Sequence, residues 1–254
     1  MKVRRPFLYP ALVGIALFLL DALQRWVYVA YAPVQPESRI SGEDGPRTTV
    51  VMVAGQGLDD IETATSLRDL ESAYQSLLQL NRGRLEVTAI TPGRPSYSNE
   101  GVVEAVQSAR CDRLIVYLTG HGGGRNFGAV GGLNLQRDVL AQALTQASYE
   151  EATVVVDCCW SGEFSRSFEG KGFPGKVTLI TSTDAKHPSP FPVSFLSPDS
   201  FGRTLFEKWE KGSATAFEET NRERARLRWI YGPEFGLVGT LGEFRADSLP
   251  ELGQ

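Results

Sequence analysis

Short runs of β-branched and apolar residues alternate with segments whose apolar residues recur at helical spacing, and this alternation constrains the fold more than any other feature of the chain. A strand, a helix and a second parallel strand form a βαβ unit, whose crossover is almost always right-handed. Repeated units place helices on both faces of a mostly parallel sheet, so we predict an α/β fold of this kind. The predicted strands are 48–54, 85–90, 114–118, 152–156, 177–181 and a last one within 235–241; the predicted helices are 59–80, 99–108, 135–146, 201–211 and 217–231.

The first 32 residues differ in composition from the rest of the chain. Lys2, Arg4 and Arg5 precede an apolar run over 7–20, and a second apolar and aromatic stretch follows at 26–32. A basic start before a short apolar core is typical of a secretory signal peptide, whereas aromatic residues beside charges are typical of the end of a membrane anchor. We predict a single-pass membrane anchor that leaves the rest of the chain outside the cytoplasm. Secretion after cleavage of a signal peptide is the alternative. A third interpretation of this segment is a buried helix of the folded domain.

Residues 33–47 are rich in proline, glycine, serine and charged side chains, which is typical of a linker. The predicted organisation is therefore an N-terminal segment over 1–32, a linker over 33–47 and one folded domain over 48–254.

Composition excludes several classes of function. The net charge of −4 gives no basic field for nucleic acid. The chain has only two histidines and three cysteines and no CxxC or HExxH spacing, so we predict no metal site and no disulfide scaffold. A mechanism that needs a histidine has to use His121 or His187.

Rare reactive residues follow two consecutive predicted strands. His121 comes after 114–118 and Cys159 after 152–156. Function gathers at the carboxyl ends of parallel strands, and paired strands lie about 5 Å apart, so this imidazole and this thiol are predicted to meet across a cleft. A thiol nucleophile needs a base and donors for the oxyanion of the tetrahedral intermediate. The backbone amides of Gly122 and Cys159 are the candidates for those donors.

For the neighbouring residues we predict structural roles. Successive side chains on an extended chain point to opposite sides, so only one of Cys158 and Cys159 should face the cleft, and spacing alone does not say which. Asp157 is predicted to cap the following turn. Cys111 is predicted to be structural, and His187, in a proline-rich loop, a surface residue.

The segments YLTGHGG (117–123) and DCCWSG (157–162) resemble the two motifs of the caspase-like cysteine peptidases, a clan that includes caspases, metacaspases, gingipains, legumains and the catalytic subunit of the glycosylphosphatidylinositol transamidase. VVMVAGQG (50–57) and the helix after it are similar to the legumain and transamidase branch. The resemblance covers about 48–209. It implies a caspase-like αβα sandwich, Cys159 as nucleophile, His121 as general base and no cofactor.

Members of this clan cleave after Asp, Asn, Arg or Lys, depending on the branch. Resemblance to legumain places Asp199 at the floor of the S1 pocket, although Asp199 is equally suited to cap a helix that starts near 201. Thr65 stands where the legumain branch has an arginine. Ser182, after the strand 177–181, is a second candidate for contact with the substrate. The expected P1 residue is Asn or a basic residue.

These observations predict a membrane-tethered cysteine endopeptidase that acts on a peptide or protein substrate through a Cys–His dyad. A transpeptidase that uses the same acyl-enzyme and a non-catalytic caspase-like scaffold are the alternatives, and nothing in the sequence indicates the oligomeric state. A serine hydrolase would combine the HGGG run at 121–124 with a GxSxG elbow, which does not occur. A nucleotide-binding loop fails because Arg125 replaces the last glycine of GxGxxG, and no GxxxxGK[ST] occurs.

Overall fold

The computed structural model describes residues 8–30, 39–41, 45–81, 83–128, 130–190, 200–212, 214–227, 232–236 and 238–244. Its strands are β1 (Arg39–Ser41), β2 (Thr48–Ala54), β3 (Leu85–Ile90), β4 (Arg113–Thr119), β5 (Asn126–Phe127), β6 (Leu135–Gln136), β7 (Glu151–Asp157), β8 (Lys176–Thr181) and β9 (Leu241–Phe244). Its helices are α1 (Leu8–Ala30), α2 (Asp60–Leu80), α3 (Asn99–Gln107), α4 (Arg137–Gln146), the 3₁₀ helix η2 (Ser161–Phe164), α5 (Ser165–Phe168), α6 (Phe201–Glu210) and α7 (Ala216–Ala225).

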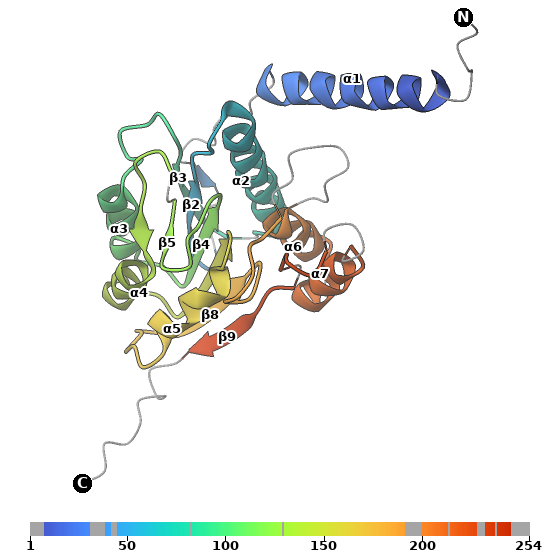
Figure 1. Ribbon diagram of the computed structural model, residues 1–254. Coiled ribbons are helices and arrows are strands. Elements are labelled where there is room, and N and C mark those ends of the chain that lie inside the picture. The colour runs from blue at the N-terminus through green and yellow to red at the C-terminus, as the bar shows by residue number, and fades with distance from the viewer. Residues whose placement is uncertain are drawn as a thin grey trace, which may run out of the picture.

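A mostly parallel sheet forms the centre of the molecule (Figure 1). Within the described residues it has seven strands in the order β1-β3-β2-β4-β7-β8-β9. The five inner strands run parallel to one another, and β1 and β9 pair antiparallel at the two edges. The predicted mixed α/β fold with a mostly parallel sheet is confirmed. β1 lies within the range that we predicted to be a linker, where it pairs with β3.

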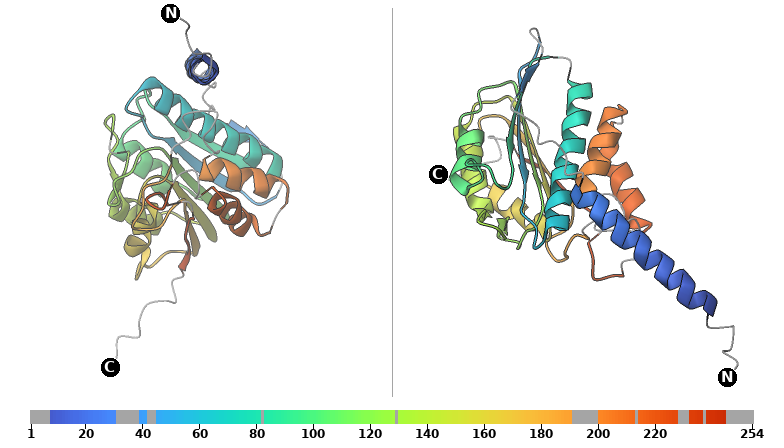
Figure 2. Two further views of the ribbon diagram at one scale, coloured as in Figure 1. Left: turned by 45° about the vertical axis from the view of Figure 1, so that its right-hand side comes forward. Right: turned by 90° about the horizontal axis from the view of Figure 1, so that it is seen from above.

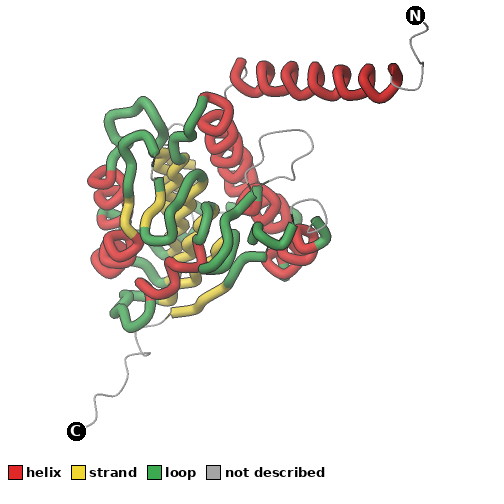
Figure 3. Tube along the Cα trace, viewed as in Figure 1, coloured by secondary structure: helices red, strands yellow, loops and turns green. Residues whose placement is uncertain are grey.

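Helices cover both faces of this sheet, as Figure 2 shows from above and Figure 3 by colour. Side chains of β2 alternate between the faces because successive residues of a strand point to opposite sides. Met52 packs in the core cluster that contains Leu70 of α2 and Phe206 of α6. Val51 packs in the cluster that contains Val102 of α3 and Leu140 of α4. A β strand that is apolar on both faces is therefore buried between two layers of helices.

The last two predicted elements differ from the structure. The last strand was predicted within 235–241 but is β9, which begins at Leu241, opposite Ile180. Before that point the Gly236 amide donates to the Pro188 carbonyl at 2.8 Å rather than to a strand of the sheet. Helix α7 ends at Ala225 rather than at 231, because the next two amides bond three residues back, to Glu223 and Arg224, and tighten the last turn.

The N-terminal helix α1 carries several large apolar side chains that are exposed, among them Val13 and Phe18. We predicted a membrane anchor or signal segment over 1–32; in the part of the chain that the structure describes, no helix combines the length and the apolar character needed to cross a membrane.

Candidate active site

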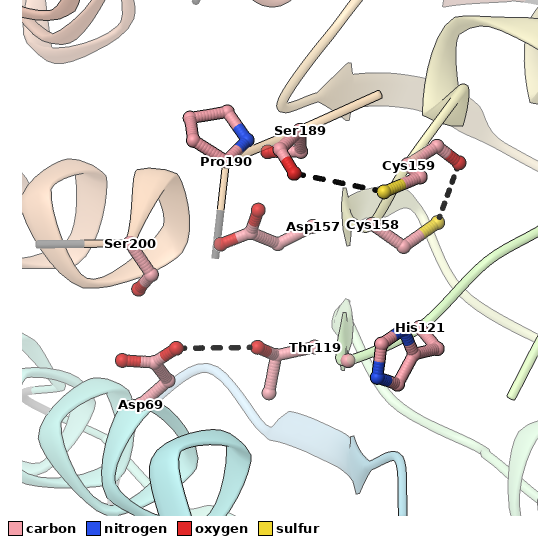
Figure 4. A pocket seen from close by; sticks show the side chains of 10 residues that line it. Asp69, Thr119, His121, Asp157, Cys158, Cys159, Ser189, Pro190 and Ser200 are labelled. Carbon is pink, nitrogen blue, oxygen red and sulfur yellow. Dashed lines mark hydrogen bonds between the residues drawn. The ribbon is translucent and has the colours of Figure 1, made fainter. Parts of the chain in front are cut away.

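The predicted reactive residues come from two neighbouring strands of the sheet. β4 and β7 pair in parallel, with Thr119 opposite Asp157, and the Gly120 amide donates to the Asp157 carbonyl at 3.1 Å. The loops that follow these strands therefore leave the sheet side by side. They open onto one cavity (Figure 4), which is lined by Asp69, Thr119, Gly120, His121, Asp157, Cys158, Cys159, Ser189, Pro190 and Ser200.

Glycines allow the backbone segments around this cavity to approach closely. Gly120 has φ +144°, and a Cβ there would lie 2.9 Å from the Cα of Gly55, at the end of β2. A Cβ on Gly122 would overlap the Cys158 sulfur and lie 3.1 Å from the carbonyl oxygen of Cys159. The backbone of Gly122 thus lies against the two cysteines, which brings together the two residues that we predicted to supply the oxyanion amides.

The two adjacent cysteines differ in accessibility. Cys158 is only 2% exposed, and its thiol donates to the carbonyl of Cys159 at 3.5 Å. Cys159 is only partly buried, and its thiol donates to the carbonyl of Ser189 at 3.6 Å. Both line the cavity, but Cys159 is the thiol that a substrate can reach.

Burial raises the pKa of both thiols. Desolvation is the main cause for Cys159, the negative charge of Asp157 adds to it, and the hydrogen bond to Ser189 opposes it. Burial raises the pKa of the Cys158 thiol well above its ordinary value. Ionisation of either thiol is therefore disfavoured at this site, so a reaction that uses the thiolate needs a base.

Trp160, directly after the cysteines, has a left-handed backbone with φ 53°. Among the described residues it is the one non-glycine with a positive φ. This conformation costs about 1–3 kcal/mol and is found mostly at functional sites. The Trp160 amide donates to the carbonyl of His187 at 3.1 Å, which holds the turn from β7 into η2.

The loop that contains His187 lies beside the site. The His187 side chain is 38% exposed and pairs with Asp184, as expected of a surface residue, and its backbone carbonyl accepts the Trp160 amide. Ser189 and Pro190 line the cavity. The sequence signal at this loop is the run HPSPFP (187–192), in which proline restricts the backbone.

Sequence reasoning also missed the residue that contacts His121. The Nε2 atom of His121 lies 2.9 Å from Oε2 of Glu62, in the first turn of α2. A signal for this residue was present, because Asp59 and Glu62 have the spacing of a helix capping box.

Two buried carboxylates are among the residues that line the cavity. Asp69, from α2, is 3% exposed and accepts a hydrogen bond from the Thr119 hydroxyl at 3.5 Å. Asp157, at the end of β7, is 7% exposed and accepts the Gly202 amide at 2.7 Å. We predicted that Asp157 caps the turn after its strand, but its carboxylate instead accepts an amide from the first turn of α6. Burial, together with the charges of these two aspartates, raises the pKa of the Tyr117 phenol well above its usual range.

Of the two residues that we predicted to contact the substrate, the structure describes Ser182 but not Asp199. Asp199 lies outside the described residues, and the N-cap of α6 is its neighbour Ser200, whose hydroxyl accepts the Arg203 amide. Ser182 is fully buried, donates to the carbonyl of Cys158 at 3.3 Å and is not among the residues that line the cavity. In this position the Ser182 hydroxyl holds the backbone of the cysteine loop from the interior of the protein.

Burial of Asp157 predicts a specific dependence of stability on pH. Desolvation raises the pKa of this carboxyl above its ordinary value of 3.8, although Arg224 and the Gly202 amide oppose the shift. The folded protein then binds this proton more tightly than the unfolded chain does. The stabilising contribution is complete below pH 3.8 and is lost as the pH rises through the raised pKa.

The Asp157→Asn variant tests this dependence, because asparagine can still accept the Gly202 amide but does not titrate. We expect the free energy of unfolding of the wild type, minus that of D157N, to fall with rising pH from about pH 4 and then to level off. Urea unfolding over a range of pH measures this difference. A difference that rises with pH would show that the native site favours the ionised carboxylate.

Comparison with known proteins identifies the fold but not a family. No model of a known protein family matches the chain, and no curated protein does. Caspase-1 from Spodoptera frugiperda is similar in structure, with a TM-score of 0.55 and 12% sequence identity over 83% of this chain and 95% of that one. Protein GSU0716 from Geobacter sulfurreducens has a TM-score of 0.51 and 12% identity over 81% of this chain and 97% of that one. The fold is therefore caspase-like, and at this identity the likeness shows the fold alone.

Proposed function

We propose that this protein is a cysteine endopeptidase that cleaves after a basic residue. The observation that carries the proposal is that His121 and Cys159, from adjacent strand ends, line one cavity together with two buried carboxylates. The caspase-like fold supports the same class of chemistry.

The proposed mechanism uses groups of this chain only. The His121 imidazole takes the proton of the Cys159 thiol, and the sulfur attacks the scissile carbonyl carbon. The amides of Gly122 and Cys159 hold the oxyanion of the tetrahedral intermediate. The intermediate collapses to a thioester as His121 returns the proton to the leaving amine. Water, activated by His121, then hydrolyses the thioester and regenerates the thiol.

The charge of the carboxylates that line the cavity supports a basic P1 residue rather than Asn. Asp69 and Asp157 are both acceptors when ionised, and hydrogen bonds from Lys or Arg to carboxylates are stronger than those from a neutral amide. Arg224 compensates part of this charge, because its field lowers the pKa of Asp157. Asp69 comes from another element, α2, and adds a second negative charge to the same cavity.

A peptide library that varies only P1 tests this proposal. We expect cleavage after Arg or Lys, and we expect Asp69→Asn to reduce that cleavage by about 10- to 100-fold, because a hydrogen bond to a charged group contributes about 1.5–3 kcal/mol. Asp60→Asn is the matched control, since it removes an exposed carboxylate from the same helix. Asp157→Asn is a second test of the preference for a basic P1 residue, because it removes the charge and keeps an acceptor for the Gly202 amide. Cleavage after acidic residues alone, or no cleavage together with no labelling of Cys159 by peptidyl acyloxymethyl ketones, would refute the proposal.

A further inference from the structure

We infer that Glu62 is a positioning residue for His121: its carboxylate selects the imidazole tautomer that can accept the proton of Cys159. This inference rests on the proposed function, because it assigns the role of base to His121. It concerns a side chain that lies outside both motifs of the sequence.

The contact between the two side chains determines which ring nitrogen carries the proton. Oε2 of Glu62 lies 2.9 Å from Nε2 of His121. An ionised carboxylate is only an acceptor, so in the neutral imidazole Nε2 has to be the donor. Nδ1 is then the unprotonated ring nitrogen, which is the one that can accept a proton from a thiol.

Glu62 is itself held in place by the start of α2. The same Oε2 atom accepts the Leu58 amide at 2.6 Å, and the Glu62 amide donates to Oδ1 of Asp59 at 2.8 Å. A Cβ on Gly57 would overlap the Glu62 side chain, so the backbone of the preceding loop packs directly against it. The carboxylate is therefore fixed by the Leu58 amide and by the capped first turn of α2 before any substrate binds.

The charge of Glu62 also fits the reaction. When His121 takes the thiol proton, the imidazole becomes a cation, and a carboxylate at hydrogen-bond distance stabilises that cation. The side chains of His121 and Glu62 are 24% and 21% exposed, so solvent screens this pair less than it screens a surface pair. Loss of the charge should therefore slow thiolate formation without changing how the substrate binds.

The Glu62→Gln variant tests the inference, because glutamine keeps an acceptor for the helix cap and removes the charge. The direct measurement is the rate at which iodoacetamide alkylates Cys159, followed by mass spectrometry of the peptide that contains it. We expect this rate and kcat to fall by about 10- to 100-fold, with KM within about twofold of the wild type. Asp60→Asn should match the wild type, and His121→Ala should show the slow alkylation of a thiol without its base.

The outcomes separate this inference from the proposed function. Alkylation of E62Q at the wild-type rate, with H121A slow, would overturn the role of Glu62 and leave the peptidase proposal intact. Peptidase activity that persists in Cys159→Ala would overturn the proposed function, whereas the alkylation rates would still test the contact between Glu62 and His121.

A measurement on the unaltered protein guards against a variant that fails to fold. The chain has two histidines, so ¹⁵N NMR of the imidazoles, with His187→Gln to assign them, reports the tautomer of His121. We expect the neutral ring to carry its proton on Nε2. A proton on Nδ1 would overturn the inference.

Discussion

Replacement of Cys159 by alanine should abolish peptide cleavage, with a fall in kcat/KM of at least about 1,000-fold, because it removes the accessible thiol that we propose forms the thioester. Cys158→Ala should keep most of the activity, since the Cys158 thiol is buried under Gly122 and is the less accessible of the two. Removal of one buried sulfur should cost only about 1 kcal/mol of stability. The two adjacent cysteines thus provide a matched pair of variants.

The measurement is labelling by a peptidyl acyloxymethyl ketone with a basic P1 residue, together with turnover of the matching peptide. His121→Ala should lose turnover in the same way as C159A. Labelling that is lost in C158A and kept in C159A would move the nucleophile to Cys158. Labelling in none of the proteins would favour the scaffold alternative.

The second large effect is expected for Gly122→Ala. The added methyl group would overlap the Cys158 sulfur and crowd the carbonyl of Cys159, so one of the two loops has to move. Either movement displaces one of the two amides that we propose for the oxyanion. Loss of one oxyanion donor typically reduces kcat by about 100- to 1,000-fold, and we expect a fall of that size.

Gly172→Ala is the control for this experiment, because a Cβ on Gly172 would meet no atom within 4 Å. Steady-state kinetics and thermal melting of both variants separate a catalytic effect from unfolding. A G122A protein that melts near the wild-type temperature and keeps wild-type kcat would show that the Gly122 backbone is not part of the oxyanion site.

The sheet was predictable because its signals are local. The strands 48–54 and 85–90 were predicted with the same bounds that β2 and β3 have in the structure. These strands are apolar runs of the length expected for a buried parallel strand, and such a pattern depends only on neighbouring residues. The last strand was misplaced because the apolar residues at 235–241 fit a strand equally well, and only the pairing of Leu241 with β8 determines where it begins.

The candidate site was only partly predictable. His121 and Cys159 stand out because each follows a strand within a short motif. Asp69 and Glu62 lie within the helical pattern of α2, where a carboxylate is ordinarily a solvated side chain or a cap. Ser182 follows a strand as His121 and Cys159 do, but its hydroxyl points to the Cys158 carbonyl in the interior.

The sequence by itself determined the five inner strands and their parallel arrangement, and it singled out His121 and Cys159, because hydrophobic periodicity and motif spacing act over a few residues. Only the tertiary structure decided which carboxylates meet at the cavity. Asp69 and Asp157 are far apart in the chain, and so are Glu62 and His121, yet the packing of α2 beside the ends of β4 and β7 brings each pair to the same site. Such contacts depend on how helices pack on the sheet, and no local pattern of residues encodes that distance.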